Sequence, residues 1–455
     1  MSPFTKKALI ILGVIVLAFM FIPSDLFFLA LIALIVLGFF IAAFYFIYIF
    51  AFKSDEKKNI TNEEGPRLVV MVNDTNFPDS AFCNWLLNQE YVIKGAIFDN
   101  AIEKIIEIDV SRQSISSLKG IEYFTALKKL DCSNNNLQIL DISENTHLQE
   151  LSCDYNQLCS LDVSGNMALE KLICYENQLT SLDVSKNKEL QELQCEDNQL
   201  TSLDVSKNKE LQELHCNCNQ LTSLDVSNNM KLQVLWCNDN LLASLDVSKN
   251  TSLKDLYCQE NKFTSLDVSS NIGLQFLGCS GLTSLDVSTN TKLQKLWCNY
   301  SSLSLLNVSK NTNLEALYCI CSNLISLDVS RNIALKELHC GGNKLTSLDV
   351  SNNTELIRLD CRSNQLTSLD ISTNVNLENL DCNGNQLTSL DISTNVNLKN
   401  LDCRGNQLTS LDISTNVNLK DLDCRGNQLT TLDTSNNPKL IYLNDRFFSQ
   451  KKPKQ

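Results

Sequence analysis

The sequence predicts a solenoid of about fifteen stacked coils that form a curved parallel β-sheet, with an N-terminal cap and a preceding transmembrane helical hairpin. Cysteines recur every 21 residues over most of the chain, and residues 8–52 are almost wholly apolar. The 455 residues include only 6 prolines and 14 glycines, which excludes a collagen-like chain. The net charge of −14 argues against nucleic-acid binding, because such proteins present a basic surface.

The apolar start of the chain predicts a membrane anchor in residues 1–52. A bilayer core of about 30 Å is spanned by about 20 helical residues. The run 8–52 is too long for one span and is broken by Pro23-Ser24-Asp25, so we expect two apolar helices. Lysines flank both ends, which places both ends in the cytoplasm. The alternatives are a cleaved signal peptide, for which no small-residue cleavage site precedes the second apolar run, and a single span that would place the repeats outside the cell.

A charged tether and a cap follow the anchor. Residues 53–66 are charged and lack apolar spacing, as is typical of a solvated linker. Residues 67–107 read as the cap, with a strand at 67–72 and then a helix. In this helix Phe82, Trp85 and Leu86 share one apolar face. A stack of repeats needs its first open face covered, and this segment is of suitable size.

The repeats occupy residues 108–443, and a basic tail follows at 444–455. A typical unit carries the pattern L-x-x-L-x-C-x-x-N-x-L, which at this period predicts a leucine-rich-repeat solenoid. One interval is shortened to 19 residues. The fifteen cysteines in register are those at 132, 153, 174, 195, 216, 237, 258, 279, 298, 319, 340, 361, 382, 403 and 424.

Each repeated position has a predicted role. The second leucine and the cysteine alternate with outward residues, as a strand requires, so they fill a narrow core. The asparagine three residues after each cysteine turns the chain and satisfies backbone groups. The aspartates of the L-D-V/I-S motif, from Asp141 to Asp433, would repel one another unless the neighbouring Ser and backbone N–H groups bind them. The acidity of the chain is therefore largely architectural.

These units resemble the 21-residue cysteine-ladder repeats of bacteria, best represented by the internalin family of surface proteins. The cap is similar too, through Phe77-Pro78-Asp79 and residues 118–124. The resemblance implies a curved stack whose inner sheet binds a protein or a glycan, often in adhesion. Such caps often carry an Asp-rich calcium-type loop, but residues 88–107 lack one. The chain also departs from the family by its double apolar run and by the absence of a sorting signal.

A stripe of aromatic residues is the candidate binding site. The residue between the second leucine and the cysteine points off the inner face of the sheet, and aromatic and histidine side chains fill this position in the middle units. An exposed aromatic patch marks a binding surface. The alternative is repeat decay around the shortened unit, with the rings covering weak packing. The candidate partner-binding residues are His215, Trp236, Tyr257, Trp297, Tyr318 and His339.

The predicted function is a membrane-anchored scaffold that binds a protein partner through this stripe; the alternative is a glycan-binding adhesion module. We expect no enzyme, cofactor or metal site. His215 and His339 are about 29 Å apart by strand spacing, too far for a catalytic pair. Cys218 and Cys321 lie five units apart, too far for one zinc site. We expect the bacterial cell envelope as the location, with the repeats inside by the charge rule or outside by the family resemblance.

Overall fold

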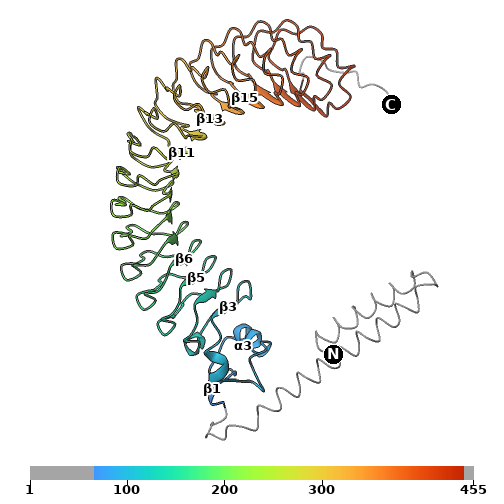
Figure 1. The fold of residues 1–455 in the computed structure, drawn as a ribbon. Helices are drawn as coiled ribbons and strands as arrows, with labels where there is room; N and C mark the ends of the chain where they lie inside the picture. Colours follow the sequence, from blue (N-terminus) through green and yellow to red (C-terminus); the bar gives the residue numbers. More distant parts are fainter. Residues whose placement is uncertain (1–65, 445–455) are drawn as a thin grey trace, which may run out of the picture. The chain divides into compact units, whose positions relative to one another are not determined.

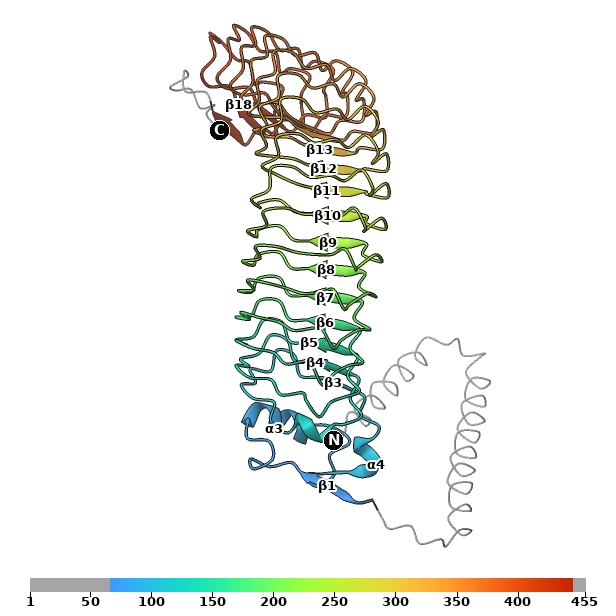
Figure 2. The same ribbon diagram turned by 90° about the vertical axis from the view of Figure 1, so that its left-hand side faces the viewer.

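The coils of the repeats stack into a curved arc whose inner side carries the strands (Figure 1). The computed structural model describes residues 66–444, and those from Arg67 onward belong to one unit. Seen from the side, the short strands lie one above another like rungs (Figure 2). Each coil thus contributes one strand to a continuous parallel sheet.

The cap combines a small sheet with a helix that is tied to the first repeat. Strand β1 (Leu68–Met71) pairs antiparallel with β2 (Ala96–Phe98). Helix α3 (Ser80–Leu87) begins at Asp79, whose Oδ1 accepts hydrogen bonds from two N–H groups of its first turn. The other oxygen of Asp79 accepts from the N–H groups of residues 116 and 117, which joins the cap to the repeats. A short helix, α4 (Asp99–Ile102), follows β2.

The main sheet has seventeen parallel strands, β3 to β19, and it is open, because among the described residues β3 pairs with β4 alone and β19 with β18 alone. The 3-10 helix η1 (Ile121–Tyr123) lies between β3 (Glu107–Asp109) and β4. The remaining strands are β4 Lys129–Asp131, β5 Glu150–Ser152, β6 Lys171–Ile173, β7 Glu192–Gln194, β8 Glu213–His215, β9 Val234–Trp236, β10 Asp255–Tyr257, β11 Phe276–Gly278, β12 Lys295–Trp297, β13 Ala316–Tyr318, β14 Glu337–His339, β15 Arg358–Asp360, β16 Asn379–Asp381, β17 Asn400–Asp402, β18 Asp421–Asp423 and β19 Tyr442–Asn444.

The sheet has more strands than the cysteine column predicts because its two end strands lack a ladder cysteine. In β3 the inward residue is Ile108, and the fully buried Val110 takes the cysteine's place. In β19 the chain continues beyond Leu443 without a cysteine at the matching position. The observed architecture is thus a leucine-rich-repeat solenoid of about sixteen turns.

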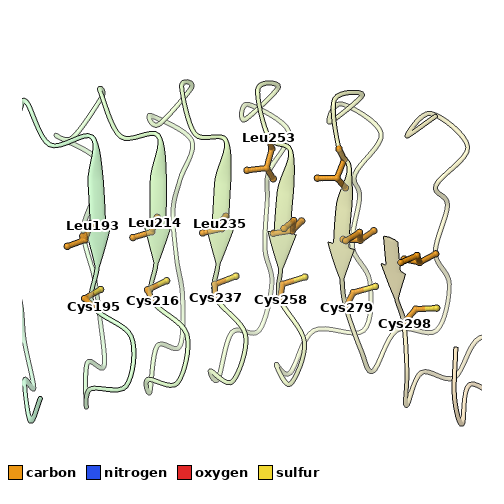
Figure 3. Packing of buried hydrophobic residues seen from close by; sticks show 14 of the residues in the cluster. Leu193, Cys195, Leu214, Cys216, Leu235, Cys237, Leu253, Cys258, Cys279 and Cys298 are labelled. Carbon is orange, nitrogen blue, oxygen red and sulfur yellow. The ribbon is translucent and has the colours of Figure 1, made fainter. Parts of the chain in front are cut away.

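Leucine and cysteine side chains form the core of every coil. In the middle coils the leucine and the cysteine of each strand point into the space between the sheet and the back of the coil (Figure 3). Leu235 and Cys237 are both 0% exposed. Burial raises the pKa of the Cys237 thiol to about 12, so this thiol is protonated and unreactive at neutral pH.

In most coils an asparagine follows the strand and binds backbone groups of two successive coils. The side-chain amide of Asn240 donates to the carbonyls of Cys216, 2.9 Å away in the preceding coil, and of Cys237, 3.2 Å away in its own. Its Oδ1 accepts from the N–H of Leu221 at 2.9 Å. The same pattern recurs along the solenoid, as the sequence predicts, so each turn satisfies backbone groups of the turn before it.

A second asparagine column lies on the back of the coils. Asn229 is fully buried and donates from Nδ2 to the carbonyls of Val205 at 3.0 Å and Asn208 at 2.8 Å. Its Oδ1 has no partner among the described residues, and the same holds for the other members of this column. The amide therefore ties two coils together while one buried oxygen stays unpaired.

The repeated aspartates bind the next turn of their own coil. Oδ1 of Asp183 accepts from the N–H of Ser185 at 2.9 Å, and these hydrogen bonds lower the pKa of the carboxyl group. In the one unit where asparagine replaces aspartate, Asn307 accepts the same bond from Ser309 at 3.0 Å. The acceptor oxygen, rather than the charge, is therefore what the turn requires.

The shortened unit loses its two residues in a turn, so the sheet continues without interruption. After Cys279 the chain turns at Gly281, whose φ of +72° favours glycine. Strands β11 and β12 on either side remain in register. Two units later Ser322 replaces the asparagine, and its hydroxyl donates to the carbonyl of Cys298 at 2.9 Å, which preserves one of the lost bonds.

The predicted fold class is wrong in one component, the transmembrane hairpin. Among residues 66–444 no helix is long and apolar enough to cross a membrane. The longer cap helix, α3, has 8 residues, or about 12 Å at the usual helical rise, against about 30 Å of bilayer core. Residues 1–52, on which the anchor was placed, and residues 53–65 of the tether lie outside the described residues, as does the tail beyond Asn444.

We expect Asn240→Ala to destabilise the solenoid by about 1–3 kcal/mol, because it removes the acceptor of the buried Leu221 N–H group. The carbonyls of Cys216 and Cys237 lose one donor each but still accept from Asn219 and Asn261. Asn240→Ser should cost less, since Ser322 shows that a hydroxyl keeps one bond. Urea unfolding followed by circular dichroism measures the difference. Asn228→Ala, at an exposed asparagine in the same coil, should leave the midpoint unchanged. An Asn240→Ala midpoint equal to that of Asn228→Ala would contradict this role.

Candidate binding surface on the inner face of the sheet

The register of the sheet brings the predicted binding residues into one file. Each is the third residue of its strand, and the pairing runs from His215 to Trp236, then to Tyr257 and Gly278. It continues through Trp297 to the last two members. We name as the aromatic ladder the set His215, Trp236, Tyr257, Trp297, Tyr318 and His339.

The rings of the aromatic ladder touch one another without a gap. His215 stacks on Trp236 with ring centroids 4.1 Å apart and an angle of 4° between the planes. Trp236 meets Tyr257 edge-on at 5.5 Å. At the other end, the Tyr318 ring lies 5.7 Å from that of Trp297 and 4.5 Å from that of His339. Such pairs contribute about 0.5–1.5 kcal/mol each beyond the burial of their area, so the file holds itself in a fixed conformation.

Gly278 allows the ladder to pass over β11, the strand that carries no ring at the ladder position. Tyr257 on β10 and Trp297 on β12 are separated by β11, yet their ring centroids lie 5.7 Å apart. Two strand spacings amount to about 9.6 Å, so the two rings lean toward each other over the glycine. A Cβ at Gly278 would lie 2.0 Å from the amide of Gln259, so the glycine also leaves room for that side chain.

Polar neighbours hold the C-terminal end of the ladder. The Tyr318 hydroxyl donates to a carboxylate oxygen of Glu337 on the next strand. Burial and this carboxylate raise the pKa of Tyr318 to about 12. Nδ1 of His339 lies 3.8 Å from Oδ2 of Asp360. The phenol and the imidazole are thus oriented by carboxylates of the adjoining strands.

The N-terminal end of the ladder is more buried. His215 is only 8% exposed, whereas Trp236 beside it is 36% exposed. Burial lowers the pKa of His215, and the carboxylate of Glu192 opposes this shift in part. Nε2 of His215 has no hydrogen-bond partner among the described residues. The ring is therefore neutral at pH 7 and serves as a flat support for the indole.

Carboxylates that the sequence analysis did not single out lie next to the ladder. The first residue of each strand points to the same side of the sheet as the third. In β8 this residue is Glu213 and in β10 it is Asp255. Burial raises the pKa of Asp255, Lys254 lowers it, and the charge of Glu213 raises it by a smaller amount. Reading this second position in register along the repeats would have found them.

Beyond the ladder the inner face becomes a charged hollow. A hollow of about 630 Å³ lies over β14 to β19 and is lined by the aspartates of the ladder position. Arg404 lies 3.2 Å from the carboxylate of Asp402 and 3.7 Å from that of Asp423 on the next strand. Arg425 donates to Asp423 at 2.6 Å. Of these contacts, the one between Arg404 and Asp423 joins neighbouring strands, and the other two join residues of one coil.

The structure brings together neither a metal site nor a catalytic pair from the candidates considered. Within residues 66–444 no group of three or more His, Cys, Asp or Glu side chains is placed to hold a metal ion. The thiols of Cys159 and Cys321 are exposed on separate coils. His215 and His339 stand at opposite ends of the ladder, six strands apart. What the six predicted residues share is a surface.

The buried neutral His215 predicts a pH dependence of stability. In the unfolded chain its imidazole has an ordinary pKa of about 6.5, and in the folded chain its pKa is lower. At pH values between these two pKa values, the unfolded chain therefore binds more protons than the folded chain. The contribution of His215 to stability should fall as the pH drops below about 6.5, with a slope of up to about 1.4 kcal/mol per pH unit. The half-buried Glu196, whose pKa is raised to about 7, contributes the opposite slope in the wild type and the variants alike. Between pH 7.5 and 5, urea midpoints should therefore change in the same way in the wild type and in His147→Gln, an exposed control, whereas His215→Gln should gain stability relative to both as the pH falls. Equal slopes in all three would contradict it.

Comparison with known proteins places this geometry in a family. No protein-family model and no curated protein matches the chain. Among solved structures, the functional domain of InlJ from Listeria monocytogenes, which includes a cysteine ladder, is 37% identical with a TM-score of 0.74, over 78% of this chain and 79% of that one. A leucine-rich-repeat protein of Leptospira interrogans is 25% identical with a TM-score of 0.61, over 75% and 96%.

YopM from Yersinia enterocolitica, at 24% identity and a TM-score of 0.55 over 70% of this chain and 73% of that one, shares the fold alone. The match to InlJ extends over most of both chains and includes the cysteine column that the sequence displays. It confirms the resemblance inferred from the repeats. The chain belongs to the cysteine-ladder leucine-rich-repeat proteins of the internalin family.

Proposed function

We propose that this protein is a scaffold that binds a protein partner through the aromatic ladder. The observation that carries the proposal is the unbroken contact of six rings in one file on the inner face of the sheet. Trp and Tyr dominate the energetics of protein interfaces. Rings already fixed by their neighbours lose little conformational entropy when a partner binds, which favours affinity.

The core beneath the ladder argues against the alternative that the rings cover weak packing. In the coils on both sides of the shortened unit, Leu277, Cys279, Leu296 and Cys298 are all 0% exposed. The strands there remain in register. The core is therefore complete without the rings, which leaves recognition as the reason for placing large aromatic side chains on this face.

The glycan alternative uses the same rings, because sugars also stack on Trp and Tyr. The family resemblance supports a protein or a glycan at this position, and we favour the protein because the ladder continues into carboxylates and a charged hollow. Catalysis has no support among these residues. A location in the bacterial cell envelope stays a prediction that rests on the family.

The test is affinity capture with the double variant Trp236→Ala/Trp297→Ala. We expect the wild-type chain to retain one discrete protein from an extract and the double variant to lose it, because the variant removes both indoles and leaves the buried leucine and cysteine columns intact. Retention measured by quantitative mass spectrometry should fall at least about tenfold for the loss of two aromatic anchors. Tyr300→Ala/Ile333→Ala, at exposed apolar residues outside the ladder, is the matched control.

Two outcomes would contradict the proposal. Equal retention by the wild type and the double variant would remove the ladder from recognition. Binding to a glycan array that disappears in the double variant, with no protein retained, would favour the glycan alternative.

A further inference from the structure

The aromatic ladder is bordered by carboxylates along the side where the strands begin. The first residues of β7, β8, β10 and β14 are all acidic, and they lie on the same face of the sheet as the ladder. The turns that follow β7, β9 and β10 on the other side add the acidic residues Asp197, Asp239 and Glu260. We call the four strand-start residues the acidic border: Glu192, Glu213, Asp255 and Glu337.

The middle of the acidic border lacks ion-pair partners. Its end members are paired, since Glu192 lies 2.9 Å from Lys171 and Glu337 lies 3.4 Å from Arg358. Among the described residues neither Glu213 nor Asp255 forms a salt bridge. Within the described part of the chain, two carboxylates thus stand without an ion-pair partner on the face that carries Trp236 and Tyr257.

The two unpaired carboxylates repel each other. They lie on strands two apart, or about 10 Å by strand spacing. Burial raises the pKa of Asp255 most, the charge of Lys254 lowers it, and the charge of Glu213 raises it by a smaller amount. The Lys254 ammonium donates its hydrogen bond to Gln233, at 2.8 Å, and forms no ion pair with Asp255 among the described residues. A cation placed between them would relieve this repulsion and gain the attraction of both.

The same face already holds one cation over a ring. The ammonium of Lys295, at the start of β12, lies 5.9 Å from the centroid of the Phe276 ring. This is within the range of a cation–π interaction. The arrangement within the chain shows that a basic side chain can be accommodated on this face beside an aromatic one.

We propose, building on the proposed function, that the partner presents a basic segment whose arginine or lysine side chains stack on the ladder at Trp236 and Tyr257 and pair with Glu213 and Asp255. Arginine suits this place best, because its planar guanidinium stacks on aromatic rings and binds carboxylates with two parallel hydrogen bonds. The rings supply contact area, and the acidic border selects the charge of the partner.

The test uses a fluorescein-labelled peptide of alternating arginine and glycine as the probe, and the same peptide with citrulline in place of arginine as its neutral counterpart. We expect the full-length chain to bind the arginine peptide in fluorescence anisotropy. Binding should weaken at least about tenfold in Glu213→Gln/Asp255→Asn and also in Trp236→Ala/Trp297→Ala, as for the loss of close charge pairs or of aromatic anchors. The citrulline peptide should bind weakly to every form.

Glu189→Gln/Glu355→Gln is the matched control, since it removes two charges at exposed positions outside the strands. It should bind the arginine peptide within about twofold of the wild type, because distant exposed charges are screened by salt. Two of the three tryptophans of the chain belong to the ladder, so intrinsic fluorescence gives a second readout of contact with the rings. Equal weakening in the control and in Glu213→Gln/Asp255→Asn, or equal binding of the citrulline peptide, would overturn the inference.

Capture of the natural partner separates this inference from the proposed function. Loss of the partner in both Trp236→Ala/Trp297→Ala and Glu213→Gln/Asp255→Asn supports both. Loss in the tryptophan variant alone leaves the scaffold function in place and overturns the basic partner. Retention in both variants overturns both. Circular dichroism and urea unfolding of each variant confirm that it is folded before binding is compared.

Discussion

The hydrogen bonds from each coil to its predecessor are the constraint on which the rest of this structure depends. After most strands, one side-chain amide reaches back to a cysteine carbonyl and a leucine N–H group of the coil before it, as Asn240 does for Cys216 and Leu221. A second amide on the back of the coil repeats the connection. Together with the strand pairing, these hydrogen bonds fix the position of each coil relative to the next. The inner and outer surfaces are therefore built from straight files of equivalent residues.

That constraint explains why irregular units are tolerated where they are. The shortened coil loses residues only in the turn after Cys279, while its strand and its buried leucines keep their places. Where serine replaces the turn asparagine at Ser322, a hydroxyl restores one of the bonds between coils. The file of side chains on the inner face continues across both changes. The ladder can thus cross the least regular part of the repeat array.

The repeat pattern predicted the files but not the contacts within them. The column before the cysteine placed all six ladder residues on one face, because alternation along a strand and in-register stacking suffice for that. It did not reveal that Tyr257 and Trp297 meet over Gly278, since this depends on how far two rings lean. Strand β3 was not counted as a coil because Val110 occupies the position of the cysteine that was used to count the coils.

Two other differences have physical causes of the same kind. The acidic border was not recognised because the first residue of each strand varies between acidic, basic and apolar types. The position indicates a binding role only once Glu213 and Asp255 are seen to form no ion pair among the described residues. The hairpin was predicted from an apolar run, its break at residues 23–25 and the lysines that flank it, and no helix of that kind occurs in residues 66–444. Local composition thus proved a weaker guide than a period repeated fifteen times.

The strands that carry the rings lie on the inner side of the arc (Figure 1), which couples recognition to the bending of the solenoid. Any opening of the arc spreads its inner surface, and the first distances to grow are those between neighbouring rings. The stacked pairs His215–Trp236 and Tyr318–His339 would resist such opening. A bound molecule that contacts both ends of the ladder could therefore open the arc only by separating the stacked rings that it touches.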